Sequence, residues 1–164
     1  MEKTDITVLV AEDDEAILAM YCMSLRKRFT TVLDAADGKI AWDIFQEEFK
    51  NRREIPVVVT DADMPGMDGI ELIQRISKVS PATQILIVSG LFKSSISIHA
   101  VNEYVTYLPK PLDVMLLNLA VSKAYGYYPQ AVWLEKLKAE VWDRNFNEDA
   151  VLEIIREAPW IQNV

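Results

Sequence analysis

The sequence of 164 residues has a single cysteine, Cys22, and a single histidine, His99. One cysteine excludes an internal disulfide and is typical of proteins from a reducing compartment. One cysteine and one histidine also cannot supply the four ligands of a structural zinc site. Disulfide-stabilised scaffolds and zinc domains are therefore excluded.

Basic residues are in the minority, because 17 Lys and Arg stand against 25 Asp and Glu and give a formal net charge of −8. This balance disfavours direct binding to nucleic acid, which depends on clustered Lys and Arg. No apolar run approaches the ~18 residues of a membrane helix. The first residues, with Glu2, Lys3 and Asp5, do not form a signal-peptide core. We therefore expect a cytoplasmic protein without membrane insertion whose partners are proteins.

Hydrophobic residues make up 51% of the chain, enough for a core, and fall into short apolar runs separated by helical patterns. The runs predict five strands, at 6–11, 31–35, 56–60, 84–88 and 106–109. The helical patterns predict helices at about 14–28, 37–49, 69–80, 98–104 and 113–125. Strands that alternate with helices predict a doubly wound α/β fold around a parallel sheet.

Polar residues stand where these apolar runs end. They are Glu12, Asp13, Asp61, Ser89 and Lys110. The carboxyl ends of parallel strands meet at one edge of the sheet, so three carboxylates, a hydroxyl and an ammonium should converge there. The acidic residues could instead favour the start of a helix, and we assign only Asp14 and Glu15 to that role.

Four stretches resemble, in this order, the receiver domain of bacterial response regulators: VLVAEDDEAI at 8–17, TDADMPGMDG at 60–69, VSG at 88–90 and YLPKP at 107–111. The resemblance covers roughly residues 5–125. It implies a five-stranded sheet of order 2-1-3-4-5, as in flavodoxin-like folds, and a switch rather than an enzyme with its own catalytic output. The chain departs from the family at 102–105, where receivers commonly have a small Gly-Ala pair.

The resemblance also implies a phosphoacceptor, Asp61, which takes a phosphoryl group from phosphohistidine and forms an aspartyl phosphate. It implies a Mg²⁺ ion held by Asp13, Asp61 and the backbone carbonyl of Asp63. Glu12 would contact the ion directly or through a water molecule.

For the remaining site residues the resemblance implies contacts and a switch. Lys110 would contact a phosphoryl oxygen and, at rest, Asp61, and it would precede a cis bond to Pro111. The Ser89 hydroxyl would contact another phosphoryl oxygen. Ser89 and Tyr107 would then change position together as the switch.

We predict a receiver domain at 1–126 and a helical extension at 127–164, where Pro129 and Asn147 can each begin a helix. The extension packs on the receiver or binds a partner, which includes a second copy in a homodimer. The main functional hypothesis is a switch that is phosphorylated by a histidine kinase or histidine phosphotransfer protein and then binds or releases a downstream protein. The alternatives are a phosphorelay intermediate and the receiver fragment of a longer hybrid kinase or enzyme-linked regulator.

Overall fold

The computed structural model describes residues 3–90, 103–142 and 148–158. At its centre lies a parallel sheet of five strands in the order β2-β1-β3-β4-β5. The strands are β1 Thr4–Ala11, β2 Phe29–Ala35, β3 Val57–Asp61, β4 Gln84–Ser89 and β5 Val105–Pro109. The predicted α/β class and strand order are confirmed. The helix predicted at 98–104 lies almost entirely outside the described residues.

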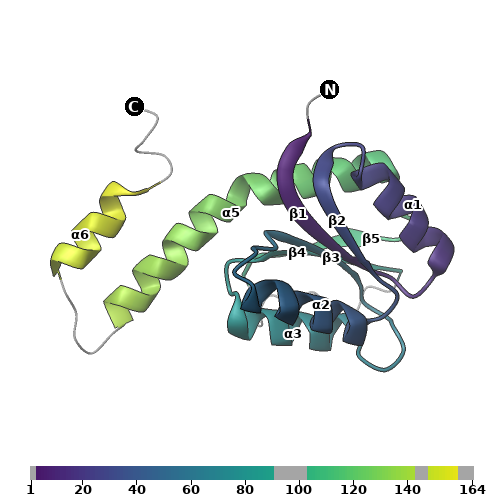
Figure 1. Ribbon diagram of the computed structural model, residues 1–164, viewed down its shortest axis with the longest axis horizontal. Coiled ribbons are helices and arrows are strands. Elements are labelled where there is room, and N and C mark those ends of the chain that lie inside the picture. Colours follow the sequence, from purple (N-terminus) through teal and green to yellow (C-terminus); the bar gives the residue numbers. More distant parts are fainter. Residues whose placement is uncertain (1–2, 91–102, 143–147, 159–164) are drawn as a thin grey trace.

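Helices cover both faces of the sheet. Helices α1 (Glu15–Leu25) and α5 (Val114–Trp142) lie on one face, and α2 (Gly38–Lys50) and α3 (Gly69–Val79) lie on the other (Figure 1). Alternate residues of β1 enter the two cores: Val8 and Val10 pack under α1 and α5, whereas Leu9 packs under α2 and α3. Strands β3 and β4 are buried along their whole length, as a central parallel strand requires.

Aspartates begin the first three helices. The Asp14 carboxylate accepts hydrogen bonds from the amides of Ala16 and Ile17, at 2.9 and 3.0 Å. Asp37 and Asp68 cap α2 and α3 in the same way. Each cap satisfies amides that have no partner within the helix. Asp14 therefore has the helix-capping role that we assigned to it.

The predicted end of the fifth helix at Gly126 is wrong. Helix α5 continues through Gly126 and Pro129 as one helix of 29 residues. Proline removes the hydrogen bond that its amide would donate to the Tyr125 carbonyl. Packing against β3 and β4 offsets this loss, because α5 buries Ala124 and Ala131 on either side of the interruption. No described helix, α5 included, combines the length and apolar character needed to cross a membrane.

Side chains beyond Gly126 attach α5 to the rest of the sheet. The Tyr104 hydroxyl, just before β5, donates to Glu135 at 3.2 Å, and Lys138 forms ion pairs with Glu135 and Glu103. These contacts involve the segment where the sequence departs from the family. The part of α5 beyond Gly126 therefore packs on the segment that precedes β5.

Helix α6 (Glu148–Arg156) lies beside the far half of α5 (Figure 1). The Trp133 indole donates to the Ile154 carbonyl at 2.6 Å, and Ala158 is buried. Val141, near the end of α5, is 48% exposed. The proposed cap residue Asn147 lies outside the described residues.

Gly126→Ala should stabilise the protein. Gly126 lies inside α5, and a Cβ built there meets no atom within 4 Å. Alanine should therefore raise the free energy of unfolding by about 0.5–1 kcal/mol, since glycine loses more backbone entropy in a helix. Thermal unfolding should show a melting temperature higher by about 1–4 °C. A lower melting temperature would mean that the helix ends at Gly126.

Candidate functional site: an acidic pocket at the carboxyl edge of the sheet

The strand register brings the predicted site residues to one edge. Ala11 pairs with Thr60, so Glu12 and Asp61 follow at the same level of β1 and β3. Asp61 pairs with Val88, and Ser89 pairs with Pro109, which places Ser89 and Lys110 one step further along β4 and β5. Residues separated by almost a hundred positions in the sequence thus meet in one pocket.

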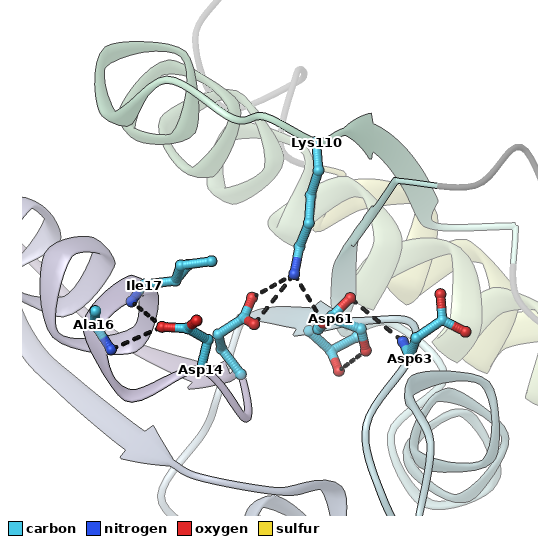
Figure 2. Close-up of polar contacts among 8 residues, drawn as sticks. Asp14, Ala16, Ile17, Asp61, Asp63 and Lys110 are labelled. Carbon is cyan, nitrogen blue, oxygen red and sulfur yellow. Dashed lines mark hydrogen bonds and ion pairs between the residues drawn. The ribbon is translucent and has the colours of Figure 1, made fainter.

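Lys110 lies between two buried carboxylates. Its Nζ is 2.8 Å from Oδ2 of Asp61 (Figure 2). The same Nζ is 2.9 Å from Oε2 of Glu12. The side chains of Glu12 and Asp61 are 2% and 6% exposed, whereas that of Lys110 is 24% exposed. The predicted contact between Lys110 and Asp61 is present, and the contact with Glu12 is an addition that the sequence did not indicate.

Burial and charge act against each other in this pocket. Burial raises the pKa of Glu12, the hydrogen bond from Lys110 partly lowers it, and the negative charge of Asp61 raises it again. Burial disfavours the charge on Lys110, but hydrogen bonds to Asp61 and Glu12 raise its pKa overall. Lys110 therefore stays protonated and neutralises part of the negative charge of Glu12 and Asp61.

Asp13 completes a group of three carboxylates. Glu12, Asp13 and Asp61 each offer one oxygen, and these oxygens lie within 4.8 Å of one another. The three carboxylates and one ammonium carry a combined charge of −2. Hard divalent cations such as Mg²⁺ prefer carboxylate oxygens, so the donor set fits the predicted ion.

The other predicted residues are Asp63, Ser89 and Tyr107. The backbone amide of Asp63 donates to Oδ1 of Asp61 at 3.3 Å (Figure 2). Ser89 is buried, and its carbonyl accepts hydrogen bonds from the Lys110 amide and the Tyr107 hydroxyl, both at 2.9 Å. The half-buried Tyr107 packs against the core on the α2 and α3 side. The bond between Lys110 and Pro111 is cis, as the resemblance implied.

Two further residues shape the pocket, and the sequence analysis did not assign them this role. Tyr21 is buried, and burial followed by the charge of Glu12 raises the pKa of its phenol. Gly69 begins α3 so close to β3 that a Cβ there would lie 2.1 Å from the Asp61 carbonyl oxygen. The only sequence signal for Gly69 is its place at the start of a predicted helix, and Tyr21 resembles any buried helix residue.

A doubly wound parallel sheet with a half-buried lysine between two buried carboxylates at its carboxyl edge defines a class of α/β proteins with an acidic pocket. The sequence model of the response regulator receiver domain matches residues 8–122. The chain belongs to the response regulator receiver domain family.

Among its relatives, the sensor kinase CckA of Brucella abortus (strain 2308) is 31% identical over 118 residues, which are 71% of this chain and 12% of that protein. The response regulator receiver protein CpdR of the same organism is 32% identical over 83 residues, 51% of this chain and 65% of CpdR. The chain thus spans only a small part of CckA and less than two thirds of CpdR.

Solved structures of receiver domains resemble this chain in fold. A response regulator receiver domain protein from Clostridium thermocellum is 29% identical with a TM-score of 0.64, and the match covers 74% of this chain and 94% of that one. The receiver domain of the hybrid histidine kinase CckA is 28% identical with a TM-score of 0.60. This match covers 73% of this chain and 98% of that one. The fold is therefore that of a receiver domain.

Proposed function

We propose that this chain is a phosphoacceptor receiver of a two-component signalling system. Asp61 accepts a phosphoryl group from a phosphohistidine of a histidine kinase or a histidine phosphotransfer protein, and the phosphorylated chain changes its binding of a downstream protein. The observation that carries the proposal is the Lys110 ammonium within 2.9 Å of both Asp61 and Glu12 in a buried pocket.

The chemistry is an in-line displacement. A carboxylate oxygen of Asp61 forms a bond to phosphorus while the bond between phosphorus and the histidine nitrogen breaks, and the imidazole leaves with its electron pair. Lys110 is positioned to exchange one of its carboxylate contacts for a phosphoryl oxygen. The fixed positive charge of Lys110 then stabilises negative charge in the transition state.

Glu12, Asp13 and Asp61, together with the carbonyl of Asp63, are the proposed holders of Mg²⁺. When bound, the ion supplies the positive charge that lets a phosphoryl group approach a site of charge −2. The Asp61 carboxylate remains the nucleophile.

Ser89 and Tyr107 form the proposed switch. The Ser89 hydroxyl would donate to a phosphoryl oxygen, which would move the end of β4. The Tyr107 hydroxyl is hydrogen-bonded to the Ser89 carbonyl, so a shift of Ser89 pulls directly on β5. This coupling is the physical link between Asp61 and a protein-binding surface.

We further propose that residues 1–126 form the receiver and residues 127–164 its extension, and that the protein acts in the cytoplasm without a catalytic output. The second candidate is a receiver within a longer kinase. The match to 12% of CckA favours it, since CckA is a sensor kinase of much greater length. A short-lived aspartyl phosphate favours a switch, whereas efficient return of the phosphoryl group to a histidine phosphotransfer protein favours a relay.

Labelling by a small phosphoryl donor tests the proposal. Acetyl phosphate should add one phosphoryl group to the full chain in the presence of Mg²⁺. Chelation of Mg²⁺ with EDTA should slow labelling by about 100-fold or more, because charge repulsion is then uncompensated. Intact-protein mass spectrometry measures the modification. Equal labelling with and without Mg²⁺ would contradict the proposed metal site.

A further inference from the structure

A second cavity lies at the edge of the sheet opposite to the acidic pocket. It has a volume of about 500 Å³, within the range of small-molecule sites, about 300–1,000 Å³. The amino ends of β1 and β3 form one wall, and α5 beyond Tyr125 forms the other. The family match ends at residue 122, so the cavity depends on the extension of this chain.

Three aromatic side chains line the cavity: Tyr125, Tyr128 and Trp133. All three are half-buried. The Trp133 indole is fixed by its hydrogen bond to the Ile154 carbonyl, at 2.6 Å. Aromatic rings attract cations through the negative potential of their faces.

The charges in the cavity are unbalanced. Asp5, Glu54 and Glu157 contribute three carboxylates, and Lys136 contributes the one ammonium, so the lining carries a net charge of −2. Lys136 lies 3.9 Å from Glu157. Within the described parts of the chain, Asp5 and Glu54 have no basic partner.

A hydroxyl group orients one of the two carboxylates that lack a basic partner. Thr30 donates to Asp5 at 2.9 Å. The Tyr128 phenol lies near Glu54, and burial and then the charge of Glu54 raise its pKa, which keeps the phenol protonated beside the carboxylate. Asp5 and Glu54 are both exposed, so a ligand in the cavity can reach them.

We propose that this cavity binds an organic cation of the alkylammonium or alkylguanidinium class. An anion would be repelled, and a neutral ligand would leave Asp5 and Glu54 without a counter-charge. A metal ion is disfavoured, because only Glu12, Asp13 and Asp61 form a close group of ligands among the described residues. The cation is either a free amine or guanidine, or the side chain of Lys or Arg from a protein.

Nuclear magnetic resonance of the full ¹⁵N-labelled chain tests the proposal with propylguanidinium as the probe. The indole N–H signal of Trp133, assigned with Trp133→Phe, should shift and saturate. The neutral analogue butyramide should shift it at least about fivefold less at equal concentration. Equal or stronger saturable binding of butyramide would overturn the proposal, as would the absence of saturable binding of propylguanidinium.

Matched variants test the role of the carboxylates. Glu54→Gln keeps the size and shape of the side chain but removes its charge, so propylguanidinium should bind about 3- to 10-fold more weakly. Glu47→Gln removes an exposed charge outside the cavity and should leave binding unchanged. Equal weakening by both variants would show only a general charge effect and would overturn the site.

A capped arginine, with acetyl and methylamide groups, distinguishes the two sources of the cation. Binding at least as tight as that of propylguanidinium supports an arginine side chain of a protein. Binding of propylguanidinium alone supports a free guanidine or amine. Both results support a cation site, whereas failure of both probes rejects it.

Discussion

Replacing Asp61 by asparagine should abolish phosphorylation by acetyl phosphate in the presence of Mg²⁺, with labelling reduced by at least about 100-fold. The amide of an asparagine side chain is a far poorer nucleophile than a carboxylate. The substitution also removes one oxygen anion from the group formed with Glu12 and Asp13, so Mg²⁺ should bind more weakly. Intact-protein mass spectrometry and calorimetric titration with Mg²⁺ measure the two effects.

Asp63→Asn is the matched control. Asp63 is two residues from Asp61, and the proposal uses only its backbone carbonyl. Labelling of this variant should therefore stay close to that of the wild type. Thermal unfolding of both variants should remain a single transition, which shows that they fold. Persistent labelling of Asp61→Asn, or its loss in Asp63→Asn alone, would refute the assignment of Asp61.

Replacing Gly69 by alanine should strongly destabilise the protein. The added Cβ would lie 2.1 Å from the Asp61 carbonyl oxygen and 3.0 Å from Cα of Ala62. Both contacts are with the backbone, so either α3 or the end of β3 must move. Overpacking of this kind should lower the free energy of unfolding by about 2–4 kcal/mol. The melting temperature should fall by roughly 5–15 °C.

Acetyl phosphate labelling of Gly69→Ala should also be slower, because the displaced backbone carries the nucleophile. Gly126→Ala provides the comparison, since it makes the same chemical change where no atom lies within 4 Å. It should raise the melting temperature, whereas Gly69→Ala should lower it. A melting temperature of Gly69→Ala equal to that of the wild type would show that α3 does not approach Asp61 so closely.

The strands were predictable because their apolar runs are short, distinct and separated by helical patterns. Each predicted strand matches an observed one to within about two residues. Asp14 likewise marked the start of α1, and the caps at Asp37 and Asp68 were found in the structure. These signals are local, so they can be read without knowledge of the packing.

The end of α5 was not predictable in this way. Gly126 and Pro129 are local signals for the end of a helix, yet α5 passes through both. The decisive contribution is burial of Ala131 and the contacts of Glu135 and Lys138 with the segment before β5. Such tertiary packing outweighs helix propensity, which amounts to about 1–3 kcal/mol for glycine and proline.

The sequence by itself determined the residue types of the pocket and their order, and hence that Glu12, Asp13, Asp61, Ser89 and Lys110 lie at one edge of the sheet. Only the tertiary structure decided that Lys110 contacts both Glu12 and Asp61, and that Tyr21 and Gly69 border the site. The reason is geometric. A position at the carboxyl end of a parallel strand fixes which edge a residue occupies. Contact within a few ångströms depends on side-chain directions and helix positions that arise from packing across the whole sheet.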